Sequence, residues 1–155
     1  MSFTFIIGAI VAYLLGSIPS GLWVGQYFFK KDIRQFGSGN LGSTNAFRVL
    51  GKKAGSLVLF FDIFKGFLAM ILALTIFKQP DISPLWIASF AVIGHTFPIF
   101  ASFKGGKAVA TFAGMILAYQ PLLLLYGLII FLVLLAITRM VSLTAMVTIT
   151  LGVFL

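Results

Sequence analysis

One glycine-rich segment of the sequence has the residue types and spacing of an anion-binding site. It reads FGSGNLGSTNAFR over residues 36–48, with glycines at Gly37, Gly39 and Gly42. Glycines permit the positive φ angles at which successive backbone N–H groups converge on an anion. Short polar side chains add further donors: Ser38, Asn40, Ser43, Thr44 and Asn45. We predict a phosphate-binding loop here, and a flexible glycine-serine turn is the alternative.

A helix is expected to follow this loop, with Ser43 or Thr44 as its cap and its N-terminal end favouring an anion. Arg48 lies four residues after Thr44 and three after Asn45, so these side chains share a helical face. The glycine spacing also matches the G-x-G-x-x-G dinucleotide motif, but no strand pattern precedes Gly37. The lysine of a P-loop is also missing, because Ser43 stands in its place. Both soluble nucleotide-binding motifs are therefore excluded, while the anion-binding chemistry remains.

A second glycine-rich segment has similar chemistry. It reads FKGGKAVAT over residues 103–111, where Lys104 and Lys107 flank Gly105 and Gly106. The glycines are expected to free the backbone, and the segment opens an apolar helix whose N-terminus favours an anion. A basic anchor at the membrane interface is the alternative. Together, the two segments favour a substrate that carries phosphate groups.

The composition is that of a membrane protein. The chain has 155 residues, of which 61% are hydrophobic and 9% charged, with a mean hydropathy of +1.15. A soluble domain is about 25% charged. With no cysteine, one histidine and three acidic residues, a disulfide framework is excluded, and neither a metal centre nor a cofactor is expected. We attribute the net charge of +8 to cytoplasmic loops rather than to nucleic-acid binding.

We expect an all-α polytopic bundle, a single domain over residues 1–155, with about five full spans and a partial sixth. The apolar stretches cover residues 3–29, 55–77, 85–100, 108–119, 122–138 and 142–155. The first is interrupted by GSIPSG, where Pro19 removes a backbone donor. A broken helix at membrane depth needs a packed or cavity-lining position, and a simple proline kink is the alternative.

The basic residues are concentrated in alternate links between the apolar stretches. Nine of the eleven lysines and arginines fall at residues 30–54, 101–107 and 139–141. The positive-inside rule then places these three links in the cytoplasm and the N-terminus outside. Both glycine-rich segments are therefore expected at the cytoplasmic face.

Three ionisable residues fall inside apolar stretches. Asp62 and Lys65 are three residues apart on one expected helix, where a mutual ion pair is the simplest account and substrate contact the alternative. His95 lies near the cytoplasmic end of its stretch, and a buried structural histidine or a base would both fit there. These three residues are therefore candidates for structure or for chemistry.

The whole sequence resembles the bacterial membrane family of acyl-phosphate:glycerol-3-phosphate acyltransferases, the PlsY type. The segments that carry the resemblance are GSIPSG at 16–21, GSGNLGSTNAFRVLGKKAG at 37–55, DIFKG at 62–66, GHTFPIFASFKGGKAVAT at 94–111 and VSLTAM at 141–146. The resemblance implies a seven-helix bundle in the bacterial inner membrane, with its active site on the cytoplasmic face. It also implies acyl transfer from acyl phosphate to the sn-1 hydroxyl of glycerol-3-phosphate, which gives lysophosphatidic acid and phosphate in phospholipid synthesis.

The resemblance and the residue chemistry described above together suggest roles for individual residues. The catalytic candidates are Ser38, Arg48, Lys107 and His95. The candidates for substrate binding are Gly37, Gly39, Asn40, Gly42, Thr44, Asn45, Lys104, Gly105, Gly106, Thr111 and Ser142. The H-x-x-x-x-D motif of soluble glycerolipid acyltransferases is excluded, because Phe100 stands at its aspartate position.

The sequence departs from the family pattern in two respects. Ala108 replaces a glycine that is usual after the second-loop lysine, and the chain ends before the family's last helical hairpin and polar C-terminal motif. We therefore expect a C-terminally incomplete chain. We also expect a monomer whose partners are the bilayer and the two substrates, with no nucleic acid.

Several alternatives stay open at this level. The proton acceptor is a substrate phosphate, His95 or a residue of the missing C-terminal motif. Arg48 and Lys107 could exchange the phosphates that they bind. A transporter of phosphate or organophosphate is the competing class of protein, because broken helices and anion-binding loops also build transport sites. A small structural membrane subunit is a third class, disfavoured by the glycine-rich loops.

Overall fold

The computed structural model describes residues 2–152, and all its named elements over that range are helices. In chain order they are α1 (Phe3–Gly16), α2 (Ser20–Phe29), the 3-10 turn η1 (Ile33–Gln35), α3 (Ser43–Leu50), α4 (Lys52–Thr75), α5 (Pro84–Thr96), the 3-10 turn η2 (Ile99–Ala101), α6 (Val109–Tyr119), α7 (Pro121–Thr138) and α8 (Val141–Gly152). The predicted all-α class is confirmed.

Four stretches of the described chain are long and apolar enough to cross a membrane. They are Phe3–Phe29, Lys52–Thr75, Pro84–Ala101 and Pro121–Thr138. The expected span over residues 108–119 forms the shorter helix α6, whose 11 residues reach only roughly 17 Å at 1.5 Å per residue. By length, the structure therefore supports four of the five full spans expected from the sequence.

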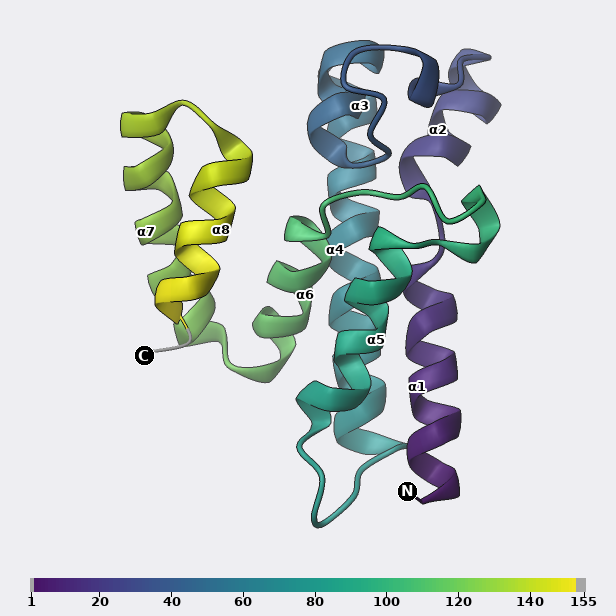
Figure 1. The fold of residues 1–155 in the computed structure, drawn as a ribbon, viewed down its shortest axis with the longest axis vertical. Helices are drawn as coiled ribbons and strands as arrows, with labels where there is room; N and C mark the ends of the chain where they lie inside the picture. The colour runs from purple at the N-terminus through teal and green to yellow at the C-terminus, as the bar shows by residue number, and fades with distance from the viewer. Residues whose placement is uncertain (1, 153–155) are drawn as a thin grey trace.

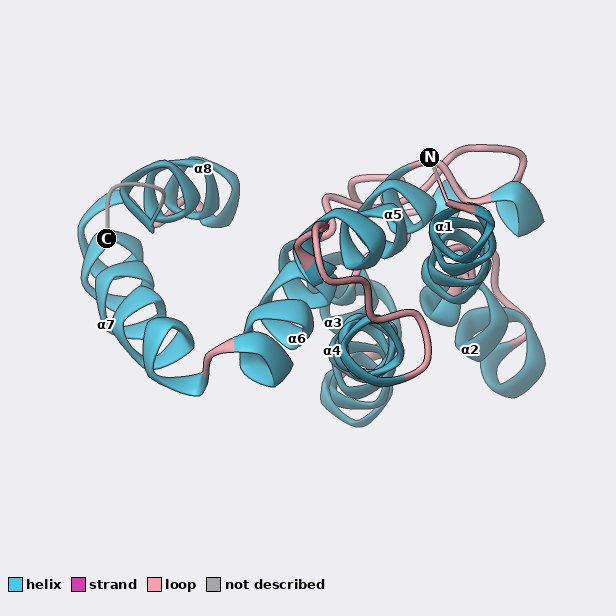
Figure 2. Ribbon diagram, turned by 90° about the horizontal axis from the view of Figure 1, so that it is seen from below, coloured by secondary structure: helices cyan, strands magenta, loops and turns pink. Residues whose placement is uncertain are grey.

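Helices α1, α4, α5 and α6 form the main bundle, with α2 above α1 and α3 beside the upper part of α4 (Figure 1). Helix α4 packs against α6, and α1 packs against α5. The hairpin of α7 and α8 stands to one side of this bundle in both ribbon views (Figures 1 and 2). The first glycine-rich loop precedes α3 and the second precedes α6, so neither belongs to the hairpin of α7 and α8.

Small residues let the helices of the bundle approach closely. Buried alanines line the contact between α1, α4 and α5: Ala9, Ala12, Ala69, Ala73, Ala88 and Ala91. Where α4 crosses α6, a Cβ atom on Gly66 would collide with the carbonyl oxygen of Thr111. Small residues at such crossings are typical of membrane helices, because they allow backbone-to-backbone packing.

The three basic links lie toward one end of the molecule. In Figure 1 the α2–α3 loop, the α5–α6 loop and the α7–α8 link are all in the upper half. The N-terminus, the α4–α5 link and the α6–α7 link lie in the lower half. The alternation expected from the charges is therefore present in the fold.

Candidate active site

The first glycine-rich loop connects η1 to α3 and has the predicted backbone at two of its three glycines. Gly37 and Gly39 have φ angles of 61° and 70°, in the left-handed region that favours glycine. Gly42 differs from the prediction, because it is extended, with a φ angle of −73°. The loop therefore turns at its first two glycines and leads straight into α3 at the third.

Asn45 stabilises this loop from its buried side. It is 1% exposed, and its Nδ2 donates hydrogen bonds to the carbonyl oxygens of Ile33, Phe36 and Asn40 at 3.0, 3.2 and 3.0 Å. Its Oδ1 accepts the N–H of Ser38 at 3.0 Å. The amide that we expected to bind substrate is thus directed at the loop backbone, on the side of α3 opposite to solvent.

Asn40 and Gly42 show two further differences from the sequence-based expectation. The Asn40 Oδ1 accepts the N–H of Gly42 at 3.1 Å, so this side chain also stabilises the turn. Gly42 itself is the N-cap of α3, without a side-chain cap bond, while Ser43 and Thr44 are the first helical residues. The predicted Ser43 or Thr44 cap is therefore wrong. The Asn45 N–H donates to the Gly42 carbonyl oxygen at 3.1 Å, whereas the first two N–H groups of a helix, here those of Ser43 and Thr44, lack an intrahelical acceptor and suit an anion.

The exposed edge of the first loop carries the charge. Arg48 and Thr44 are exposed on the same face of α3, one turn apart, as predicted. The Arg48 Cδ lies 3.3 Å from the position that a Cβ on Gly37 would take, so the arginine stem crosses over the glycine turn. Ser38, next to Gly37, is exposed. The loop thus presents Ser38, Thr44 and Arg48 together at its surface.

The second glycine-rich loop connects η2 to α6, and its glycines serve a different purpose from the one expected. Positive φ angles occur at Ser102, Phe103 and Ala108, at 55°, 59° and 55°. Gly105 and Gly106 are needed for close contact instead. A Cβ on Gly105 would collide with the carbonyl oxygen of His95, and one on Gly106 with its Nε2.

Ala108 stands at a strained position. Its φ angle of 55° lies in the left-handed region, where an alanine costs roughly 1–2 kcal/mol relative to an ordinary conformation. The residue is also the N-cap of α6 and is 4% exposed. The glycine that the resemblance implies at this position would adopt this backbone without that strain.

The cations of the second loop face solvent. Lys104 and Lys107 are both exposed. The Lys104 N–H donates to the carbonyl oxygen of Ala101 at 3.2 Å, which fixes the start of the loop. Gly105 and Gly106 lie between the two lysines, half-buried and buried respectively. The loop therefore anchors its centre in the protein and presents its two charges outward.

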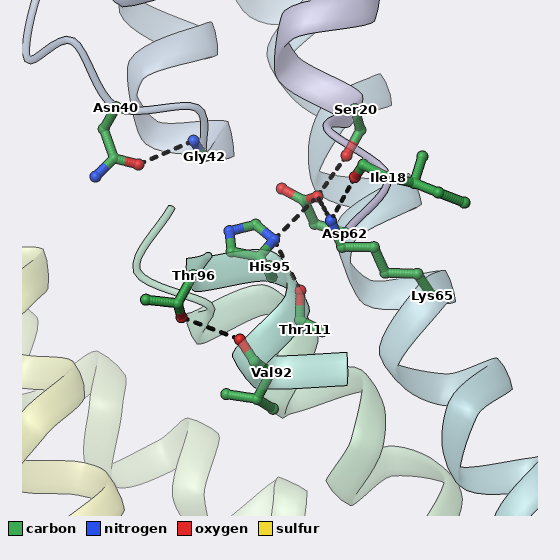
Figure 3. A network of polar contacts seen from close by, with 10 residues as sticks. All are labelled: Ile18, Ser20, Asn40, Gly42, Asp62, Lys65, Val92, His95, Thr96 and Thr111. Atoms are coloured by element: carbon green, nitrogen blue, oxygen red, sulfur yellow. Dashed lines mark hydrogen bonds and ion pairs between the residues drawn. The ribbon is translucent and has the colours of Figure 1, made fainter. Parts of the chain in front are cut away.

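His95 is buried at the end of α5 and joins this loop to the bundle. It is 7% exposed, and its carbonyl oxygen accepts the N–H of Gly106 at 3.0 Å. Its Nδ1 lies 3.1 Å from the hydroxyl of Thr111 and 3.5 Å from Oδ1 of Asp62 (Figure 3). Thr111 is fully buried, so this residue, expected to bind substrate, contacts the histidine.

The ion pair expected within α4 is present. Lys65 Nζ lies 2.9 Å from Oδ1 of Asp62, and both residues are buried, with 5% and 1% exposed. Lys65 also donates to the carbonyl oxygen of Ile18 at 2.9 Å, and Ser20 Oγ donates to Asp62. The carbonyl oxygen of Ile18, in the break between α1 and α2, therefore finds its partner in the charged pair. In the sequence, the only signal for this contact is the presence of a broken helix together with charges inside an apolar stretch.

The break also borders a small cavity. It has a volume of about 10 Å³ and lies between the α1–α2 break, the first loop, α4 and the end of α5. Pro19, Leu41, Asp62 and His95 are among its lining residues. The cavity-lining interpretation of the interrupted first span is therefore supported, and the first loop approaches His95 here.

The side chain of Ser142 is outside the part of the structure that is described. Over residues 2–152, three or more His, Cys, Asp or Glu side chains are nowhere grouped so as to hold a metal ion. The site consists of backbone amides, hydroxyls and cations, which suit phosphate ligands.

Comparison with known proteins agrees with this chemistry. The family model described as "Glycerol-3-phosphate acyltransferase" matches residues 6–155. This chain belongs to the glycerol-3-phosphate acyltransferase family. A relative of that name from Enterococcus faecalis is 62% identical over 139 residues, which cover 90% of this chain and 64% of the relative. One from Listeria welshimeri is 56% identical over 149 residues, covering 95% of this chain and 75% of the relative.

Solved structures of this acyltransferase family agree with the fold. The glycerol 3-phosphate form of PlsY (YgiH), an integral membrane glycerol 3-phosphate acyltransferase, matches with a TM-score of 0.87 and 38% identity. The match covers 97% of this chain and 74% of that one. A second form of the same enzyme, with lysophosphatidic acid, matches with a TM-score of 0.83 and 37% identity. The predicted membership of the PlsY family is confirmed.

Proposed function

We propose that this chain transfers an acyl group from acyl phosphate to the sn-1 hydroxyl of glycerol-3-phosphate. The products are 1-acyl-glycerol-3-phosphate and inorganic phosphate. The observation that carries the proposal is that two cation-bearing glycine-rich loops lie toward one end of the bundle, in a chain of this family. The two solved forms of the relative, named for glycerol 3-phosphate and lysophosphatidic acid, support this substrate and this product.

The reaction requires the protein mainly to bind and align the two substrates. An acyl phosphate is a mixed anhydride, so its carbonyl carbon is already electrophilic. The hydroxyl oxygen forms a bond to this carbon, the bond to the phosphate oxygen breaks, and the hydroxyl proton must be accepted. Alignment of the two reactants and stabilisation of the developing charge then supply most of the rate enhancement. A site with several cations and amide donors suits this task.

The two loops divide the phosphates between them. In our proposal Arg48, Ser38 and the first turn of α3 hold the acyl phosphate, while Lys104 and Lys107 hold glycerol-3-phosphate. The exposure of all four side chains supports this assignment. The exchanged assignment of Arg48 and Lys107 is the alternative. Of the three proton acceptors considered, burial of His95 favours a phosphate oxygen of a substrate over the imidazole.

The cellular setting follows from the same proposal. The chain acts as a single integral membrane domain and a monomer in the bacterial inner membrane, with the basic end of the bundle in the cytoplasm. The concentration of Lys and Arg in the links at that end supports this orientation.

Release of inorganic phosphate tests the proposal directly. The chain is purified in detergent and given acyl phosphate and glycerol-3-phosphate, with the Enterococcus faecalis relative as positive control. We expect Arg48→Ala to reduce kcat/KM by roughly 100-fold or more, about 2.7 kcal/mol of transition-state stabilisation. Lys53→Ala, which removes an exposed cation from α4, is the matched control and is expected to stay near wild type. Retained activity in Arg48→Ala would exclude the proposed role of Arg48.

A transporter is the alternative function, and one measurement separates the two. The anion-binding groups lie at one end of the bundle, whereas a transport site lies near the midplane of the bilayer. Uptake of glycerol-3-phosphate into proteoliposomes without formation of an ester would favour the transporter.

A further inference from the structure

We infer that the buried Asp62–Lys65 pair is a positioning device that acts through His95 to hold the second glycine-rich loop, residues 104–107. This inference deepens the proposed function, on which it rests for the identity of the ligand that the loop binds. Its first test measures the state of the histidine ring and does not depend on that function.

His95 contacts the loop at two points. The carbonyl oxygen of His95 accepts the N–H of Gly106 at 3.0 Å. The ring nitrogen Nε2 lies against Gly106 so closely that a Cβ atom there would collide with it. Backbone and ring of one buried residue therefore set the position of the loop between Lys104 and Lys107.

The other ring nitrogen is directed at groups that can fix the tautomer. Nδ1 lies 3.1 Å from the hydroxyl of Thr111 and 3.5 Å from Oδ1 of Asp62, and Figure 3 shows both on the same side of the ring. An ionised carboxylate accepts hydrogen bonds and donates none, whereas a hydroxyl can do either. The negative charge of Asp62 therefore favours a proton on Nδ1. Nε2 then presents a lone pair to the loop.

Asp62 is held in place by one group from its own helix and one from α2. Lys65 lies 2.9 Å from its Oδ1, and Ser20, at the start of α2, donates to the same oxygen. Lys65 in turn donates to the carbonyl oxygen of Ile18 at 2.9 Å. The break between α1 and α2 thus fixes the carboxylate, the carboxylate fixes the histidine, and the histidine fixes the loop.

The experiment uses the fact that the chain has a single histidine. Protein with ¹⁵N-labelled histidine, freed of any tag, is studied by NMR in detergent at a pH at which the ring is neutral. We expect a protonated Nδ1 and an unprotonated Nε2 in the wild type. In the double variant Asp62→Leu with Lys65→Met, we expect the proton to move to Nε2. Removal of both charges avoids an unpaired buried ion, and such exchanges are often tolerated.

Two further variants identify Asp62 as the group responsible. Thr111→Val removes the hydroxyl beside Nδ1 but keeps the carboxylate, so the wild-type tautomer should persist. Asp81→Asn removes an exposed carboxylate from the α4–α5 link and should also leave the ring unchanged. A wild type with its proton on Nε2, or the same tautomer in wild type and double variant, would overturn the inference.

Kinetics then test the consequence for the loop. A misplaced binding loop weakens substrate binding, so we expect the double variant to raise KM for glycerol-3-phosphate about tenfold and to change kcat less. A fall in kcat at unchanged KM would instead make these residues catalytic and would contradict a positioning role. If the protein shows no acyl transfer at all, the proposed function fails. The NMR result still decides whether Asp62 determines the tautomer of the His95 ring.

Discussion

At the scale of single residues, Asn45 organises the first glycine-rich loop with one side chain. Its Nδ2 donates to three carbonyl oxygens between Ile33 and Asn40, and its Oδ1 accepts the N–H of Ser38. Buried polar groups that lose their partners cost about 1–3 kcal/mol each. The shape of the loop therefore depends more on this buried amide than on any exposed residue.

Replacement of Asn45 should accordingly destabilise the protein. We expect Asn45→Ala to lower the free energy of unfolding by about 2–4 kcal/mol, because several loop groups lose their partner at once. Asn40→Ala, which removes the single bond to the Gly42 N–H, is the control and should cost about 1 kcal/mol. Denaturation in detergent measures both. Equal effects of the two substitutions would show that Asn45 does not organise the loop.

The ion pair between Asp32 and Arg34 is expected to make the free energy of unfolding depend weakly on pH. Their side chains form an ion pair at 2.6 Å beside η1, and the hydrogen bond from Arg34 holds the pKa of Asp32 below its ordinary value of 3.8. Because the folded pKa is depressed, the stabilisation is present above about pH 4 and is lost as the pH falls through the folded pKa. Both side chains are partly exposed, so the effect is at most about 1 kcal/mol.

The matching measurement compares unfolding of wild type and Asp32→Asn between pH 3 and 7. We expect the wild type to lose its advantage over the variant on acidification, while Asp81→Asn, an exposed carboxylate in the α4–α5 link, follows the wild type. A constant difference between wild type and Asp32→Asn at all pH values would contradict this.

At the scale of the elements, the crossing of α4 and α6 decides where the second loop ends. Gly66 and Gly114 are placed so that the backbones touch, because a Cβ on either would collide with a carbonyl oxygen of the other helix. Thr111, which contacts His95, lies in the first turn of α6 beside this crossing. The packing of two helices therefore determines the environment of the histidine.

Substitution at this crossing is expected to be costly. Gly66→Ala should lower the free energy of unfolding by about 2–3 kcal/mol through overpacking, although alanine is the better helix former. Gly127→Ala on α7 is the matched control, since its Cβ would meet nothing nearer than Thr148 Cγ2 at 3.9 Å. This control should be neutral or stabilising by about 0.5–1 kcal/mol. Thermal denaturation of both variants distinguishes a tight crossing from a loose one.

At the scale of the whole molecule, charge and connectivity produce two unlike ends. One end carries the loops with Arg48, Lys104 and Lys107, and the other carries the N-terminus and the short α4–α5 and α6–α7 links. Lys and Arg in short loops set the orientation of a polytopic protein during insertion. The same charges that orient the chain can therefore serve the binding of phosphate.

The absence of cysteine from the sequence allows a clean test of this orientation. Single cysteines at Gln35 and at Asp81, on opposite ends, are labelled with a membrane-impermeant thiol reagent. We expect Gln35→Cys to react in inside-out vesicles and Asp81→Cys in right-side-out vesicles. The reverse pattern would invert the proposed topology, and reaction of both in the same vesicles would contradict the alternation of the links.

The sequence by itself determined the features that depend on local composition and spacing. Apolar stretches of about 20 residues predict membrane helices, Pro19 predicts the break in the first span, and the spacing of Asp62 and Lys65 predicts their ion pair. The positive φ angles of Gly37 and Gly39 follow from the same local reasoning. These predictions hold because each depends on residues within one continuous segment of the chain.

Only the tertiary structure decided which partner each polar group takes. The Asn45 amide binds the loop backbone instead of being left for substrate, because carbonyl oxygens of the folded loop surround it. Lys65 donates to the carbonyl oxygen of Ile18, 47 residues away in the sequence. His95 accepts the N–H of Gly106 and contacts the hydroxyl of Thr111, which lie 11 and 16 residues further along the chain. Such contacts depend on how helices distant in sequence cross, which the periodicity of a single segment does not encode.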